Sequence, residues 1–290
     1  MTTDDAATLT QACTITGLDC QDAVLLRRHA TAVYHLPRAG AVARIASIDH
    51  LEQSRLSVQV TRWLLGKGFP ATAPLDVDQP VVVEDSVVTF WRYYPQDSRE
   101  LPPVRELSRI LRQLHTLEPP PFPLPAYEPL KGFMRELATH GSTVLSAEEH
   151  KFLQRRANEL LDAYRCLESH LGHSMIHGDP RTGNLLWDGE DVVLGDWDSV
   201  SHGPRELDLI ITYQGVRYGR SADTLDEFAT IYGWDIRSWP GYDLLRDLRD
   251  LHTLSAPLRL ARHRADVAEE LHHRLMGLQA GDHGQQWRSF

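Results

Sequence analysis

This chain of 290 residues has few cysteines and no long apolar run. Its three cysteines, Cys13, Cys20 and Cys166, are too few and too scattered for a disulfide framework or a thiolate metal site. It contains no run of about 18 apolar residues, which a membrane-spanning helix needs. The start, Met-Thr-Thr-Asp-Asp, has neither the positive charge nor the apolar core of a signal peptide. We therefore expect a reduced, cytoplasmic protein with no membrane contact.

Basic residues are fewer than acidic residues. The chain carries 30 Lys and Arg against 40 Asp and Glu, a formal net charge of -10 at pH 7. It has no basic run, which a protein that neutralises nucleic-acid phosphates usually presents, so nucleic acid is not an expected partner. Only Lys67, Lys131 and Lys151 are lysines, so a cation needed before residue 67 has to come from arginine.

Several motifs of other enzyme classes are missing. The chain has no Gly-x4-Gly-Lys-Ser/Thr sequence, which excludes a P-loop enzyme, and no Gly-x-Ser-x-Gly nucleophile elbow. His170, His173 and His177 lie near one another in sequence, but no further ligands follow at the spacing of a zinc site.

The spacing of hydrophobic residues, which make up 42% of the chain, divides it into two parts. Short Val- and Ala-rich segments separated by turn residues predict antiparallel strands and one helix within residues 1–93. Apolar spacings of three and four residues predict a mainly helical second part, residues 94–290, with short strands and a loop at 174–198. The predicted strands of the first part are 23–28, 32–36, 41–46, 80–83 and 86–91. The predicted helices are 50–65, 102–117, 147 to about 171, and the region from 208 to the end apart from loops near 218–221 and 233–240.

The polar residues of segment 174–199 are the candidate catalytic and metal-binding residues. His177-Gly-Asp179 and Asn184 precede a predicted hairpin, and Asp196 follows it. Because a hairpin returns the chain to its start, Asp196 is expected near Asn184 although 12 residues separate them. Amide and carboxylate oxygens that converge in this way suit Mg²⁺, which prefers oxygen ligands and keeps positions open for phosphate oxygens. Asp179 is placed beside such a metal, where it can accept a proton or orient a hydroxyl group.

The sequence His-Gly-Asp-x4-Asn, then Gly-Asp-Trp-Asp, then Gly-Pro-Arg-Glu-Leu-Asp208, resembles the aminoglycoside phosphotransferase family of small-molecule kinases. The resemblance implies an α+β, bilobal protein-kinase-like fold: a small β-rich N-terminal lobe (1–93) and a large, mainly helical C-terminal lobe (94–290). It implies that Asp179 is the catalytic base and that Asn184 and Asp196 hold Mg²⁺. His177 and Asp208 would support the catalytic loop. Asp198 would either face the metal or hydrogen-bond within the turn, and we favour the turn.

The resemblance also implies a nucleotide, ATP or GTP, between the lobes, with its base against residues 90–94 and with Trp91 and Tyr93 as contacts. The family's strand lysine, which reaches the phosphates, is replaced here by Arg44, since no lysine precedes residue 67. Two further features depart from the family. Helix 50–65 has only Glu52 as an acid, and the expected phosphate-covering loop, residues 28–32, has no glycine.

These features together predict transfer of the γ-phosphoryl group of ATP or GTP to a hydroxyl group of a small molecule. The acceptor is either an antibiotic such as an aminoglycoside, which would make the protein a resistance enzyme, or a metabolite such as an amino alcohol or sugar. The net negative charge would favour a cationic acceptor. The alternative is a catalytically silent kinase-fold protein that binds a ligand or partner. A protein kinase is disfavoured because the stretch from Asp196 to Asp208 is too short for an activation segment. A monomer or homodimer is expected.

Overall fold

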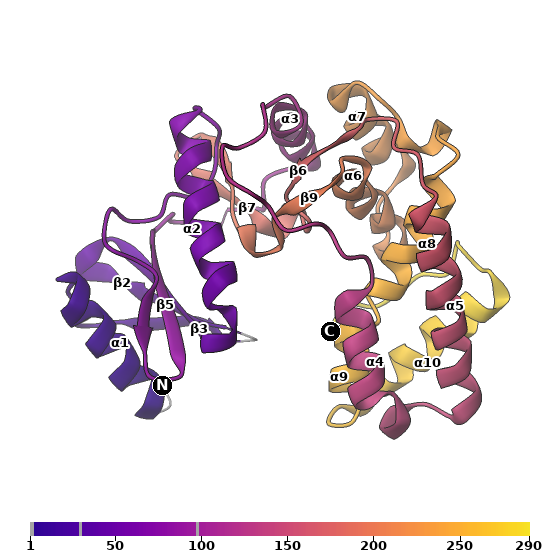
Figure 1. The fold of residues 1–290 in the computed structure, drawn as a ribbon, viewed down its shortest axis with the longest axis horizontal. Helices are drawn as coiled ribbons and strands as arrows, with labels where there is room; N and C mark the ends of the chain where they lie inside the picture. The colour runs from indigo at the N-terminus through magenta and orange to yellow at the C-terminus, as the bar shows by residue number, and fades with distance from the viewer. Residues whose placement is uncertain (1–2, 29–30, 97–98) are drawn as a thin grey trace. The chain divides into compact units, whose positions relative to one another are not determined.

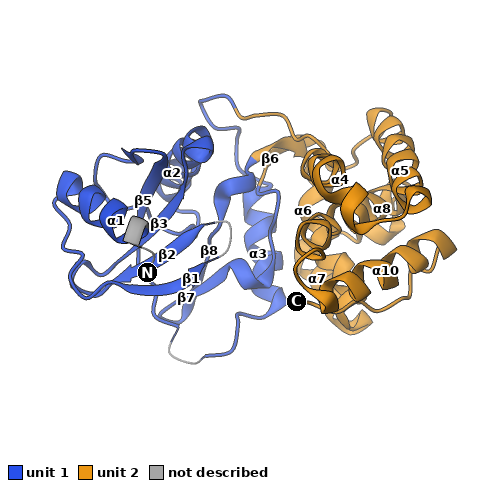
Figure 2. Ribbon diagram, turned by 90° about the horizontal axis from the view of Figure 1, so that it is seen from below, with its two compact units in different colours: residues 1–123, 177–200 blue, residues 124–176, 201–290 orange. Residues whose placement is uncertain are grey.

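A computed structural model describes residues 3–28, 31–96 and 99–290 (Figure 1). The chain divides into two compact units (Figure 2). Unit 1 contains residues 1–123 and 177–200, and unit 2 contains residues 124–176 and 201–290. Segment 177–200, with the predicted catalytic residues, therefore groups with the N-terminal sheet. The predicted lobe boundary after Tyr93 stays a prediction.

Unit 1 is built on a five-stranded antiparallel sheet with the strand order β1-β2-β3-β5-β4. The strands are β1 (Val24–Arg28), β2 (Ala32–Leu36), β3 (Ala41–Ser47), β4 (Val81–Val83) and β5 (Ser86–Arg92). All five strands were predicted from the sequence, with ends that differ by at most one residue. The predicted phosphate-covering loop includes His29 and Ala30, which lie outside the described residues.

The two faces of β3 have different surroundings because side chains alternate along a strand. Ala41, Ala43 and Ile45 point into a core shared with α1 (Thr3–Thr16). Val42 and Arg44 are half-buried on the opposite face. This alternation places Arg44 on the face that carries the candidate site.

Helix α1 corrects the prediction of a single helix in this region. Leu9, Ala12 and Cys13 follow helical spacing and are buried against the sheet. The Thr-rich composition obscured this stripe. Thr10 and Thr14 are compatible with a helix here because their hydroxyl groups donate to the carbonyl groups four residues earlier.

The remaining elements of unit 1 are α2 (Leu51–Gly66), α3 (Val104–Leu114) and the hairpin of β7 (Leu185–Asp188) and β8 (Asp191–Leu194). Helix α2 confirms the predicted helix 50–65, and the hairpin forms where the sequence predicted it. Leu194 joins the hairpin to the segment after α2, because its backbone donates to Pro70 and accepts from Thr72.

Unit 2 is mainly helical. Its helices are α4 (Lys131–Val144), α5 (Ala147–Arg165), α6 (Glu206–Tyr213), α7 (Ala222–Tyr232), α8 (Tyr242–His252), α9 (Ser255–Leu260) and α10 (Ala265–Ala280). A two-stranded sheet of β6 (His173–Ile176) and β9 (Ser201–Pro204) accompanies them. In the described ranges, no helix has both the length and the apolar character needed to cross a membrane.

Helix α5 begins as predicted, with a capping box of Ser146 and Glu149, but it ends at Arg165 and not near residue 171. The carboxylate of Glu206 explains the early end. It accepts hydrogen bonds from the Ser169 hydroxyl and the Leu171 backbone N–H, each at 2.7 Å. These contacts hold the segment after α5 in a non-helical path despite its apolar residues.

Candidate active site

His177 joins the two loops that carry the predicted catalytic and metal-binding residues. The backbone N–H of Asp179 donates to His177 Nδ1 at 3.3 Å, and His177 Nε2 lies 2.9 Å from the carbonyl oxygen of Gly195. A ring that accepts at Nδ1 carries its proton at Nε2, which can then donate to Gly195. The ring is fully buried against Trp197, with ring centroids 4.6 Å apart.

Gly178 allows this loop to lie close to the turn that follows β8. Its φ of +84° is in the left-handed region, and a Cβ at this position would clash with the carbonyl oxygen of Ser199. Only glycine combines this backbone conformation with the close approach.

Asn184, another of the predicted site residues, is hydrogen-bonded to the same two loops. The side-chain N–H of Asn184 donates to the backbone carbonyl oxygen of Asp179 at 2.9 Å. The backbone carbonyl oxygen of Asn184 accepts from the Gly195 N–H at 2.8 Å. The amide oxygen of Asn184 is therefore directed away from the Asp179 backbone. The Asp179 carboxylate lies 3.2 Å from Nε of Arg181, an exposed arginine that the sequence prediction did not single out.

Asp196 begins the turn after β8 in a left-handed backbone conformation, with φ 64° and ψ 55°. Aspartate tolerates this region better than most residues, and strained backbone of this kind is common at functional sites. Asn184 and Asp196 both line a cavity of unit 1, which we name the larger cavity because a smaller one lies on the other side of Arg44, beside Asp198. Two oxygen donors on one cavity wall fit a Mg²⁺ ion, which would complete its coordination with phosphate oxygens and water.

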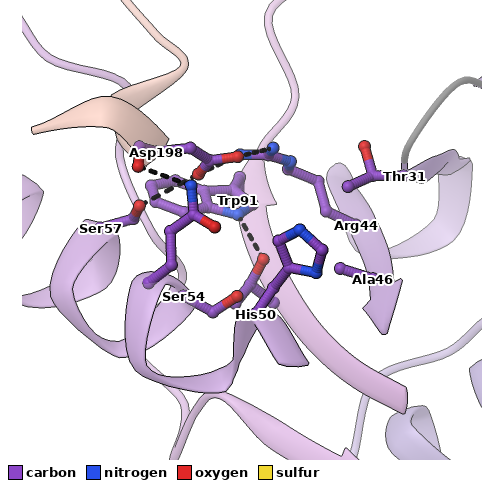
Figure 3. Close-up of a pocket in the computed structure, with 10 residues that line it drawn as sticks. Thr31, Arg44, Ala46, His50, Ser54, Ser57, Trp91 and Asp198 are labelled. Atoms are coloured by element: carbon purple, nitrogen blue, oxygen red, sulfur yellow. Dashed lines mark hydrogen bonds and ion pairs between the residues drawn. The ribbon is translucent and has the colours of Figure 1, made fainter. Parts of the chain in front are cut away.

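Arg44 and Asp198 form an ion pair that the sequence prediction did not foresee (Figure 3). The distances are 3.2 Å from Nη1 to Oδ1 and 2.5 Å from Nη2 to Oδ2, so the guanidinium group uses both terminal nitrogens. Nη2 is also 3.6 Å from Oδ1 of Asp196. Burial by itself lowers the pKa of Arg44, but Asp198 and then Asp196 outweigh it and raise the pKa above its ordinary value.

The larger cavity has a volume of about 410 Å³ and is lined only by residues of unit 1. Its lining includes the apolar residues Leu26, Val33, Val42 and Leu186 and the polar residues Arg44, Asn184 and Asp196. Trp91 and Tyr93, the predicted base contacts, both line it. Phe90 does not, since it is buried in the core shared with α1 on the other face of the sheet.

Asp208 is fully buried in α6 of unit 2. Its predicted support of the catalytic loop stays a prediction. Sequence reasoning also missed Gln53 and Ser57 of α2, which contact Asp198 and its neighbour Trp197. Neutral side chains on a helix give no charge pattern by which such a role could be found.

Comparisons with known proteins were made for both the sequence and the structure. None of the curated proteins compared with the chain matches it. Three solved structures illustrate its similarity in fold. An amicoumacin kinase, hAmiN, in complex with AMP-PNP, Ca²⁺ and Ami has a TM-score of 0.79 and 13% identity, covering 98% of this chain and 96% of that one. A choline/ethanolamine kinase family protein from Mesorhizobium loti has a TM-score of 0.66 and 18% identity, with coverage of 98% and 97%.

The third, an aminoglycoside phosphotransferase from Streptomyces rimosus, has a TM-score of 0.62 and 18% identity, covering 86% of this chain and 98% of that one. At such low identity these similarities show the fold, which is the predicted α+β, protein-kinase-like one. The model of the phosphotransferase enzyme family matches residues 29–248, about three quarters of the chain. The chain therefore belongs to the phosphotransferase enzyme family.

Proposed function

We propose that the protein is a Mg²⁺-dependent small-molecule kinase that transfers the γ-phosphoryl group of ATP or GTP to a hydroxyl group. The observation that carries the proposal is the convergence of Asp179, Asn184 and Asp196 through hydrogen bonds that involve His177 and Gly195. An acceptor-binding protein without phosphoryl transfer has no need for a base, an amide and a carboxylate in this arrangement.

The proposed reaction assigns a separate task to each residue. Asp179 accepts the proton of the acceptor hydroxyl group while the new oxygen–phosphorus bond forms and the bond to the leaving nucleoside diphosphate breaks. Asn184 and Asp196 would hold Mg²⁺, which when bound neutralises charge on the phosphate oxygens. The guanidinium group of Arg44 borders the same cavity and contributes positive charge towards the phosphates.

The larger cavity supports the nucleotide part of the proposal. Its volume falls within the range typical of small-molecule sites, about 300–1,000 Å³. Trp91 and the apolar lining residues suit a purine base, and Asn184 and Asp196 suit a metal-bound triphosphate. Tyr93, stacked on His35 with ring centroids 3.7 Å apart, would complete the base-binding end.

The acceptor we propose is an antibiotic such as an aminoglycoside, or an amino alcohol or sugar of metabolism. The structures similar in fold include kinases named for amicoumacin, spectinomycin and choline. The net charge of -10 favours a cationic acceptor. A cytoplasmic location and a monomeric or homodimeric state belong to the same proposal.

A catalytically silent kinase-fold protein is the second candidate, because Arg44 replaces the strand lysine and α2 lacks the usual acid. Incubation with γ-labelled ATP, Mg²⁺ and a panel of antibiotics, amino alcohols and sugars separates the two. Label transferred to at least one acceptor supports the kinase. Tight binding of ATP with no transfer to any acceptor would favour the silent protein.

A further inference from the structure

The strand cation Arg44 has no acidic partner on the helix beside the sheet. Helix α2 contains a single acid, Glu52, in its first turn, where it pairs with Arg55 at 2.7 Å. The partner of Arg44 comes instead from the turn after β8, where Asp198 lies two residues beyond the proposed metal ligand Asp196. The positive charge of Arg44 on β3 is therefore balanced by a carboxylate of the proposed metal-binding loop and not by an acid on α2.

Helix α2 holds this loop with neutral hydrogen bonds (Figure 3). Ser57 Oγ is 3.0 Å from Oδ1 of Asp198 and 3.1 Å from the carbonyl oxygen of Trp197. Gln53 Nε2 donates to the carbonyl oxygen of Asp198 at 2.6 Å. The Asp198 carboxylate is therefore fixed by three donor groups, two from the guanidinium group of Arg44 and one from Ser57.

Asp196 and Asp198 face different cavities, although only one residue separates them. Asp196 lines the larger cavity together with Asn184. Asp198 lines a smaller, more enclosed one between β3, β5 and the start of α2, with His50 and Ser57. Arg44 borders both cavities, and its Nη2 is 2.5 Å from Asp198 but 3.6 Å from Asp196. The nearer carboxylate thus pairs with both terminal nitrogens of Arg44 and leaves Asp196 available at the larger cavity.

We propose that Asp198 is a positioning residue, the counter-ion that keeps Arg44 in place and off the metal ligand Asp196. This inference rests on the proposed function of the same site. Without the charge of Asp198, Arg44 would move to the remaining carboxylate, Asp196, and compete with Mg²⁺ for it. Nucleotide affinity and metal requirement would then change together.

The first test compares Asp198→Asn with Asp191→Asn, the same chemical change at an exposed position at the start of β8. Calorimetric titration with AMP-PNP at several Mg²⁺ concentrations measures both quantities without turnover. We expect Asp198→Asn to weaken AMP-PNP binding by at least about tenfold and to raise the half-saturating Mg²⁺ concentration several-fold. Asp191→Asn should match the wild type. Unchanged affinity in Asp198→Asn, or weaker binding with unchanged Mg²⁺ dependence, would overturn the inference.

A second test moves the carboxylate to the helix. In the Asp198→Asn background, Ser57→Glu brings a carboxylate from α2 towards the position that Asp198 occupies. It should recover part of the AMP-PNP affinity, whereas Gln59→Glu, on the exposed face of α2, should recover none. Equal affinity in the two double variants would contradict a counter-ion role.

Thermal unfolding shows whether each variant is folded. If Asp198→Asn does not fold, Ser57→Ala takes its place, because it removes the hydroxyl contacts to Asp198 and to the Trp197 carbonyl oxygen and keeps the ion pair. Ser57→Ala should weaken AMP-PNP binding by about threefold, and wild-type affinity would refute the inference.

The proposed function fails in a different way, when wild-type protein binds Mg²⁺ and AMP-PNP normally but transfers phosphate from ATP to no acceptor.

Discussion

Replacing His177 by phenylalanine tests whether one buried ring aligns the proposed base with the proposed metal ligand. Phenylalanine can keep the packing against Trp197 but removes both ring nitrogens, so the hydrogen bonds of His177 with the Asp179 N–H and the Gly195 carbonyl group are lost. A buried polar group left without a partner costs about 1–3 kcal/mol. Asp179 is half-buried and can reach water, so we expect the free energy of unfolding to fall by roughly 2–4 kcal/mol.

The effect on catalysis should exceed the effect expected from lost stability. A displacement of a reacting group by about 1 Å can cost on the order of 10²-fold in rate, and this substitution releases both loops. We expect kcat to fall by about that factor in a phosphoryl-transfer assay with saturating nucleotide at a temperature where the variant stays folded.

Leu36→Ala is the matched control. Leu36 is fully buried in the core between α1 and the sheet, and its truncation costs about 2–5 kcal/mol. Because this core lies on the face opposite the site, kcat should stay near the wild-type value. If His177→Phe and Leu36→Ala lose similar stability in urea titrations and both keep wild-type kcat, the aligning role of His177 is refuted.

Local patterns in the sequence were sufficient for most of the sheet and for the grouping of site residues. β3 is a short segment of mainly small and β-branched residues, and β2 contains Val and Tyr; both lie between turn residues, which favours strands. Asp179, Asn184 and Asp196 were predicted to converge because a hairpin must return the chain, and the pairing of Leu185 with Leu194 does return it.

Contacts between distant segments were not predictable in the same way. The partner of Arg44 is 154 residues away, and nothing near Asp198 distinguishes an ion pair from a turn hydrogen bond. The end of α5 depends on Glu206, more than 30 residues later. Both outcomes are decided by tertiary structure, which overrides local preference when a buried charge must find a partner.

Three further substitutions test the remaining assignments. Asp179→Asn should lower kcat by about 10²–10⁴-fold while AMP-PNP affinity stays near wild type, and near-full activity would exclude Asp179 as the base. Asparagine tolerates the left-handed backbone at position 196, so Asp196→Asn should fold and raise the Mg²⁺ concentration that activity requires. An unchanged metal titration would show that Asp196 is not a ligand. Glu270→Gln tests stability against pH. Burial would raise the pKa of Glu270, but hydrogen bonds from Arg274 and Arg288 bring it below the ordinary 4.5. The carboxylate therefore stabilises the folded protein above that value, and its contribution is lost as pH falls through the lowered pKa. Urea titrations should show a deficit for Glu270→Gln at about pH 7 that shrinks as pH falls below about 4.5, and a deficit independent of pH would mean that the charge of Glu270 contributes nothing to the fold.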